Sequence, residues 1–313
     1  MSLITYAPPP SAAPAPAGPR TLHDLFTAYL GDVALEHQAS TQYQQRMFYQ
    51  MVLQEFGPLP LEDVTPDLLR AWKAQLTTRY ARSTVYRYMS FLSCALRYAV
   101  DCEWLAANPM AKIRKPSPGR GRVRFLTTAE RDRLLGACRA STNPALYPLV
   151  VLALATGARK NELRRLRWSE VDFTHGMLRL LKTKGQTARS VPLLGEARQL
   201  LEALAQQRRP EVAWVFPGPH GRTPRDIEYA WTLARQQAQL TNFRFHDLRH
   251  TFASYMAMAG ASLRDIADVL GHVKIAMTMQ YAHLIEGHST HAVERMIETF
   301  LTPQAPEEGA RHA

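Results

Sequence analysis

The strongest constraint on how this chain folds is a break in its helical patterning between about residues 106 and 124. The centre of the break, KIRKPSPGRGRVR, carries six basic residues, no acidic residue, two prolines and two glycines. Proline and glycine at this density interrupt both helices and strands. We therefore interpret 106–124 as a linker between two folded domains. The length of 313 residues agrees, since it is enough for two domains that each bury a core.

The region before the linker predicts a small helical domain. Residues 1–20 are rich in proline and alanine, so we expect a tail without a core of its own, and a folded domain over 21–105. Thr65 followed by Pro66 is a typical helix start, with the proline at the first helical position. Apolar side chains in the last helix recur at helical spacing and give it one apolar face. The predicted helices span 22–36, 40–55, 66–80 and 83–101.

The region after the linker predicts a second domain over 125–302, followed by a tail over 303–313. It opens with TTAE, which is typical of a capping box between Thr127 and Glu130. The hydrophobic period then changes to that of strands on both sides of a Lys/Gly/Gln turn, which predicts a β-hairpin. The predicted strands are 177–181 and 189–192. The predicted helices are 128–140, 144–156, 160–167, 195–208, 226–239, 246–259, 263–270, 274–282 and 289–301. The expected fold class is therefore mostly α with a small β-hairpin or sheet.

The net charge points to a polyanionic partner. It is +11, from 38 basic and 27 acidic residues, and the sequence pI is about 9.8. Nucleic acid is the commonest partner of so basic a protein. The basic linker then either follows a DNA backbone or serves as a solvated spacer. A membrane partner is less plausible, since the longest apolar run, 146–158, is far shorter than the roughly 20 residues that span a bilayer.

Motifs for other functions are missing from the sequence. The N-terminus lacks a basic stretch followed by an apolar one, and the three cysteines form no CxxC pair, so we expect a cytoplasmic protein with reduced thiols. There is no HExxH motif, no phosphate-binding GxxxxGK[ST] loop and no acidic metal cluster. His283, His288 and His291 match no zinc spacing. We expect neither a metal ion nor another cofactor.

Six side chains together suit chemistry on a phosphodiester. Arginine forks and lysine bind phosphate oxygens, imidazoles transfer protons, and a phenol oxygen can attack phosphorus. Taken singly, each has a plainer interpretation: a surface arginine, a turn lysine, a core or capping histidine, or a buried tyrosine. The six are Arg159, Lys184, His246, Arg249, His272 and Tyr281.

The HDLRH segment places two of these residues on one predicted helix. His246 and Arg249 are three residues apart, so they share a face and can reach the same phosphate. His250 is one position further, and we expect it to point elsewhere. The hairpin segment KTKGQTARSVPL offers two lysines, Lys182 and Lys184, which alternate along the strand.

Taken in order, these segments resemble the tyrosine recombinase (phage integrase) family. The resemblance covers about 126–300, and the helical region before it looks like the core-binding domain of that family. The order and gaps of four motifs make the resemblance specific, and all six residues fit the family pattern. Lys184 is preferred to Lys182 because Val191 follows it by seven residues, as in family hairpins. The motifs are TG-x-R-xx-EL at 156–163, TK followed by VPL at 183–193, H-x-LRH at 246–250, and LGH followed by tyrosine at 270–281.

The resemblance implies a DNA clamp and a set of roles for the six residues. Tyr281 would attack a phosphate and form a 3′-phosphotyrosine, while the two arginines and His272 stabilise the charge on its oxygens. His246 would be the base and Lys184 the acid. The implied partners are double-stranded DNA, a homotetramer on two paired sites, and accessory DNA-bending proteins in a bacterial nucleoid. No ATP is required, because the phosphotyrosine keeps the bond energy. The segment before residue 21 leaves no room for a folded arm-binding domain, which disfavours integrases of the lambda type.

Three alternatives remain open at this level. A type IB topoisomerase or telomere resolvase shares the chemistry, although the separate helical domain favours a recombinase. A DNA-binding regulator would use the helices near 246–270 without forming a covalent adduct. A relative that binds DNA but has lost cleavage is the third, and the complete set of six residues disfavours it.

Overall fold

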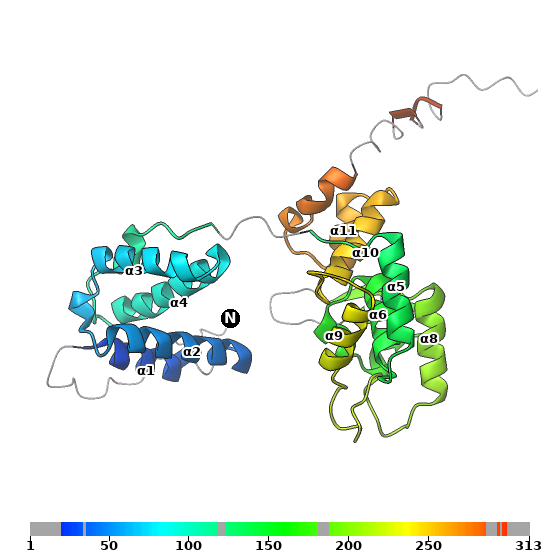
Figure 1. Cartoon of the computed structure of the whole chain (residues 1–313), viewed down its shortest axis with the longest axis horizontal. Coiled ribbons are helices and arrows are strands. Elements are labelled where there is room, and N and C mark those ends of the chain that lie inside the picture. The colour runs from blue at the N-terminus through cyan, green and yellow to red at the C-terminus, as the bar shows by residue number, and fades with distance from the viewer. Residues whose placement is uncertain are drawn as a thin grey trace, which may run out of the picture. The chain divides into compact units, whose positions relative to one another are not determined.

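The computed structural model describes residues 20–33, 36–117, 123–180 and 188–285, and also 293, 294 and 296–298. The chain divides into two compact units, Met1–Gly121 and Arg122–Ala313. Figure 1 shows the first unit in blue to cyan and the second in green to orange. The fold class predicted from the sequence, mostly helical with a small sheet, is confirmed.

The first unit is a bundle of four α-helices with two short 3-10 turns. Its helices begin and end close to the predicted positions, and Thr65 caps α3 by accepting from the backbone N–H of Leu68 at 3.2 Å. The apolar face predicted for α4 is buried, with Val85, Met89 and Leu96 at its centre. The elements are α1 (Leu22–Val33), α2 (Ala39–Phe56), η1 (Leu61–Asp63), α3 (Pro66–Arg79), α4 (Arg82–Asp101) and η2 (Pro109–Lys112).

Aromatic rings form much of this first core. Phe26 stacks on Tyr49 with ring centroids 4.2 Å apart, and Trp72 donates a hydrogen bond to Glu55 at 2.9 Å. Met110 and Ile113, which lie in the segment interpreted from sequence as linker, are buried in the same core. Their apolar side chains explain why this stretch packs on the first unit despite its basic neighbours.

The second unit is built around α6, which is apolar on almost all sides. Such a helix is expected to be buried, and it packs between α5, α8 and α10. The predicted capping box at Thr127 and Glu130 is present at the start of α5. The α-helices are α5 (Thr128–Arg139), α6 (Leu146–Thr156), α7 (Lys160–Arg164), α8 (Gly195–Gln206), α9 (Glu228–Gln237), α10 (Asp247–Met258) and α11 (Leu263–Leu270).

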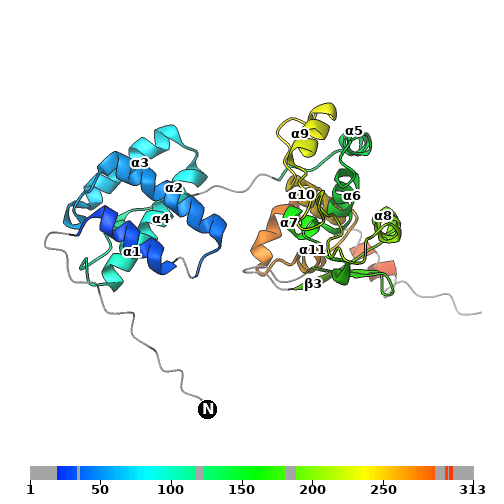
Figure 2. The same ribbon diagram turned by 90° about the horizontal axis from the view of Figure 1, so that it is seen from below.

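A three-stranded antiparallel sheet lies beside this helical core. The hairpin of β2 (Met177–Leu180) and β3 (Arg189–Pro192) agrees with the sequence prediction, and buried Leu178 pairs with buried Val191. A short strand, β1 (Val171–Asp172), was not predicted and pairs with β2 after the turn η3 (Trp168–Glu170). Strand β3 lies beside α11 (Figure 2), which brings the end of the hairpin to the site described below.

The helix predicted over 274–282 is wrong. The segment forms two 3-10 turns instead, η4 (Ile275–Met277) and η5 (Met279–Leu284). Their hydrogen bonds join residues three apart, as from the backbone N–H of Tyr281 to the carbonyl of Thr278 at 3.0 Å. The β-branched side chains of Ile275 and Thr278 have low helix propensity and agree with this outcome. The helix predicted over 289–301 lies largely outside the described residues.

Two buried hydroxyls on α10 have opposite environments. Thr251 accepts from the backbone N–H of Leu126 at 3.1 Å and donates to the carbonyl of Asp247 at 2.8 Å. The buried Ser254 hydroxyl has no hydrogen-bond partner among the residues that the structure describes.

No helix in the same described ranges is long and apolar enough to cross a membrane.

We predict that Ser254→Ala raises the free energy of unfolding by about 1 kcal/mol, because an unpaired buried hydroxyl is costly. Thr251→Val, the matched control, should lower it by about 1–3 kcal/mol, because the Leu126 amide loses its acceptor. Urea denaturation measures both. Destabilisation by Ser254→Ala would show that this hydroxyl makes a bond in solution.

Candidate active site

Five of the six predicted site residues gather where α6, α10, α11 and η5 meet. Figure 1 shows α10 and α11 side by side, and α10 also contacts α6 and η5. Arg159 follows the end of α6, His246 and Arg249 belong to the start of α10, and His272 follows α11. Tyr281 lies on η5. Segments more than 100 residues apart in the sequence therefore meet at one place.

Arg249 fixes this meeting point through two carbonyl groups. Its guanidinium donates to the carbonyl of Gly157 at 2.8 Å and to that of Leu270 at 2.6 Å, and the residue is only 3% exposed. Gly157 ends α6 in the left-handed conformation, at φ 63°. A β-carbon there would lie 2.4 Å from the ring of Phe252, so glycine is required for both conformation and space.

A buried carboxylate, Glu162, holds two more arginines. Arg189 of β3 forms a bidentate pair with it, at 2.8 and 3.2 Å, and also donates to the carbonyl of Val269. Arg159 donates to it from the backbone at 2.8 Å and from the side chain at 3.2 Å. Burial raises the pKa of Glu162, but the hydrogen bonds from Arg189 and Arg159 outweigh it and leave the pKa lowered. The ionised carboxylate thus sets the direction of both guanidinium groups.

His246 lies beside the same cations. Its pKa is lowered, first by burial and then by the positive charges of Arg249 and Arg159. The ring lines an open cavity of about 550 Å³ together with Arg159, Lys160, Arg235 and Arg244. This basic cavity is large enough for a phosphate group and its neighbours. A neutral imidazole in this position can exchange a proton or donate a hydrogen bond to an anion.

His272 is oriented by a buried threonine. Its Nδ1 atom lies 2.8 Å from the Thr278 hydroxyl, and Thr278 is fully buried. Burial, followed by the charges of Arg249, Arg159 and Arg189, lowers the pKa of His272 to about 4. The ring is therefore neutral near pH 7, and the hydrogen bond to Thr278 leaves its Nε2 atom for a ligand.

The hydroxyl of Tyr281 is hydrogen-bonded to His250, at 2.6 Å from Nδ1. The prediction that His250 points elsewhere is wrong. The last residue of HDLRH lies one turn of α10 beyond His246, and η5 crosses that turn. Tyr281 is 1% exposed, and burial raises its pKa to about 12 although Arg249 acts in the opposite direction. Its phenol is protonated at neutral pH.

The structure brings together five of the six predicted residues, Arg159, His246, Arg249, His272 and Tyr281. Lys184 and its neighbour Lys182 lie outside the described residues. Sequence reasoning did not assign Glu162, Arg189, His250 and Thr278 to the site. The signal for Glu162 was its position three residues after Arg159, at the start of a short helix. Thr278 carried no comparable signal, since its role depends on how η4 and η5 fold.

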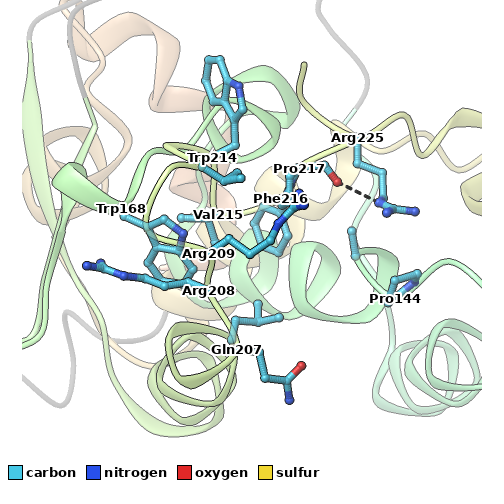
Figure 3. Close-up of a pocket in the computed structure, with 13 residues that line it drawn as sticks. Pro144, Trp168, Gln207, Arg208, Arg209, Trp214, Val215, Phe216, Pro217 and Arg225 are labelled. Atoms are coloured by element: carbon cyan, nitrogen blue, oxygen red, sulfur yellow. Dashed lines mark hydrogen bonds between the residues drawn. The ribbon is translucent and has the colours of Figure 1, made fainter. Parts of the chain in front are cut away.

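A separate cavity of about 220 Å³ lies between the end of α8 and the loop before α9. Figure 3 shows Trp168, Arg208 and Phe216 around it, with Arg225 donating to the carbonyl of Pro217 at 3.0 Å. None of the six predicted site residues lines it. Within the described residues, no group of three or more histidine, cysteine or acidic side chains could hold a metal ion.

The sequence matches two family descriptions in the order of the two structural units. Residues 21–115 match the phage integrase SAM-like domain, and residues 124–288 match the phage integrase family. The chain therefore belongs to the phage integrase, or tyrosine recombinase, family.

Curated relatives are similar over much of the chain. The shufflon-specific DNA recombinase of Escherichia coli is 33% identical over 205 residues, which are 64% of this chain and 51% of the relative. The putative integrase of Pseudomonas phage Pf1 is 32% identical over 225 residues, 71% of this chain and 64% of the relative. The integrase of Salmonella phage P22 is 30% identical over 237 residues, 71% of this chain and 59% of the relative. The chain thus spans between about half and two thirds of these relatives.

Solved structures support the same fold. The Tn1549 transposon integrase in complex with a circular intermediate DNA superposes with a TM-score of 0.73 at 18% identity, covering 88% of this chain and 99% of that one. A lambda integrase dimer bound to a COC′ core site superposes with a TM-score of 0.70 at 21% identity, covering 83% of this chain and 77% of that one.

We predict that His272 makes the fold sensitive to acid. Its pKa falls from 6.5 in the free side chain to about 4 in the folded protein. Between these two pH values the folded state therefore binds fewer protons than the unfolded state. The stability that His272 contributes is complete above pH 6.5 and is lost as the pH falls toward 4. Denaturant unfolding at about pH 7 and about pH 5 should show a smaller loss for His272→Asn than for the parent protein. Equal losses would contradict the lowered pKa.

Proposed function

We propose that this chain is a site-specific DNA recombinase that cuts and rejoins strands through a 3′-phosphotyrosine. The observation that carries the proposal is the position of Tyr281 beside a group of cations that suits one phosphate. Burial raises the pKa of Tyr281 and the charge of Arg249 opposes that rise, while Arg249 and Arg159 both lower the pKa of His246 and His272. A phenol with two guanidinium groups and two neutral imidazoles provides a nucleophile, cations for the charge that develops on phosphate, and proton-transfer groups, which suits phosphoryl transfer to tyrosine.

In the proposed reaction the arginines bind the scissile phosphate before the bond changes. Arg159 and Arg249 donate to its non-bridging oxygens, and the Nε2 atom of His272 adds a third donor. The phenol oxygen of Tyr281 forms a bond to phosphorus as the bond to the 5′ oxygen breaks. The phenol proton passes to a histidine of the HDLRH segment, and Lys184 gives a proton to the departing oxygen. The phosphotyrosine keeps the bond energy, so a second strand can be joined without a nucleotide.

DNA binding by both units follows from charge and from the relatives. The net charge of +11 favours binding to phosphates, with strong dependence on salt. Several solved relatives are complexes with DNA, including a lambda integrase tetramer bound to a Holliday junction, with a TM-score of 0.68 at 20% identity. We extend this to the present chain as a clamp of two units on duplex DNA, with four copies on two paired sites.

The C-terminal segment supports the tetramer. Among the few residues that the structure describes there, Val293 is 51% exposed, Met296 42% and Ile297 45%. Docking on a neighbouring copy would bury them.

Truncation after Glu286 is expected to spare DNA binding and cleavage of a single site and to abolish pairing of two sites, as seen by native gel electrophoresis. Loss of cooperative unfolding in the truncated protein would show instead that the segment stabilises its own domain.

Tyr281→Phe tests the proposed function directly. The variant lacks only the attacking oxygen, so it should bind DNA like the parent and form no covalent complex. A nicked suicide substrate traps the complex, and an SDS gel detects it. A covalent adduct formed by Tyr281→Phe would refute the assignment of the nucleophile. Relaxation of plasmid without any defined site would favour a topoisomerase instead.

Lys184→Ala tests the proposed acid. On ordinary DNA we expect cleavage to slow by about 10²–10⁴-fold, since the departing oxygen lacks a proton donor. In a substrate with sulfur at the bridging 5′ position, the departing sulfur needs no proton. Cleavage of this substrate by Lys184→Ala should therefore be close to the rate of the parent protein. Lys182→Ala is the matched control and should be near normal on both substrates. The opposite pattern would transfer the role to Lys182.

A further inference from the structure

The proposed reaction does not specify which histidine of the HDLRH segment accepts the phenol proton. In the structure His250 is the histidine that contacts the hydroxyl of Tyr281. We propose that His250, rather than His246, is the base that accepts the phenol proton of Tyr281. The inference rests on the proposed function, since it assumes that Tyr281 is the nucleophile. Its basis is the 2.6 Å distance between the phenol oxygen and Nδ1 of His250.

The position of His250 is fixed by the fold. It follows Arg249 directly on α10, and Arg249 is bound to the carbonyls of both Gly157 and Leu270. The residue that binds the phosphate and the residue that touches the nucleophile are thus adjacent on one anchored helix turn. The rings of His250 and Tyr281 lie with centroids 6.0 Å apart at 50°, so they meet edge to edge through the hydrogen bond rather than by stacking.

His246 is placed for a different contact. Its ring lines the basic cavity together with Arg159 and Arg244, where a phosphate can enter. It meets the ring of His250 at 88° with centroids 5.3 Å apart. The two histidines therefore have different roles in the proposal. His246 lies at the cavity expected to hold the phosphate, and His250 contacts the phenol.

The proton balance is complete with His250 as acceptor. The O–H bond of Tyr281 breaks as its proton moves to Nδ1 of His250, and the phenol oxygen forms the bond to phosphorus. The bond to the 5′ oxygen breaks, and that oxygen takes the proton supplied by Lys184. In the rejoining step a 5′ hydroxyl returns its proton to Lys184 as its oxygen forms the bond to phosphorus, and the phenol oxygen departs and recovers its proton from the His250 imidazolium. The pKa of Tyr281, raised to about 12 by burial, makes an aligned base useful at neutral pH.

Tyr281 is buried in the free protein, so DNA binding has to expose its oxygen. The 3-10 turns η4 and η5 carry the tyrosine, while His250 stays on α10. The inference requires that a shift of η5 toward a phosphate bound by Arg249 leaves the phenol within reach of the adjacent residue, His250. The same contact could instead hold Tyr281 closed, and the experiment separates these two roles.

Single-turnover cleavage of a nicked suicide substrate by full-length protein tests the base. His250→Asn places an amide oxygen near the position of Nδ1, which keeps a hydrogen-bond acceptor but takes no proton. We expect cleavage to slow by about 10²–10⁴-fold, with DNA binding and thermal stability close to the parent. The bridging-sulfur substrate should not restore the rate, since the missing group is not the acid.

A ring-fluorinated tyrosine at position 281 supplies the second readout. Its phenol is more acidic, so it should recover much of the rate in His250→Asn and little in His246→Asn, the matched control. Rescue in His246→Asn alone would return the base to His246 and overturn the inference. A normal or faster rate for His250→Asn would also overturn it and would identify the contact as a closing latch. If the parent protein forms no adduct at Tyr281, the proposed function itself fails, which is a separate result.

Discussion

The site depends on one buried guanidinium. Arg249 donates to carbonyls that end α6 and α11, and both of these carbonyls lie where a helix stops at a glycine, Gly157 or Gly271. A buried charge is costly unless it is paired or well hydrogen-bonded, and here helix C-terminal carbonyls, which carry partial negative charge, meet that need. The arrangement also holds three segments in register, because none of them can move without breaking a bond to Arg249.

The charge balance around this arginine suits an anion that is not part of the protein. Arg159, Arg189 and Arg249 lie close together, and Glu162 is the buried carboxylate that pairs with two of them. Burial and the excess of positive charge lower the pKa of both His246 and His272. A phosphate bound here would compensate the excess, since like charges in a poorly solvated site repel one another strongly. The same repulsion keeps both imidazoles neutral and able to act on that phosphate.

The sequence predicted regular elements well and the details of the site less well. The helix over 83–101 followed from one apolar face, and the hairpin from a change of period, because both patterns are local. The strand β1 was missed because a strand of two residues is too short to show a hydrophobic period. The segment 274–282 was predicted to be an α-helix, but its backbone hydrogen bonds join residues three apart. His250 was dismissed from its position on α10 alone. Its contact with Tyr281 depends on where η5 crosses that helix, which no local pattern encodes.

The 3-10 turns that carry Tyr281 have a consequence for timing. A 3-10 turn has poorer hydrogen-bond geometry than an α-helix, so the main cost of moving it is to take Tyr281 out of its buried cluster with Ile266 and Leu270. In the proposed reaction the attacking oxygen is therefore carried by a 3-10 turn, while the side chains proposed to bind phosphate lie at anchored helix ends. With Tyr281 as the proposed nucleophile, burial of its oxygen would keep it away from passing phosphodiesters until DNA binding reshapes the turn. On this proposal, accuracy in choosing where to cut would arise from the energy of that rearrangement as well as from recognition of bases.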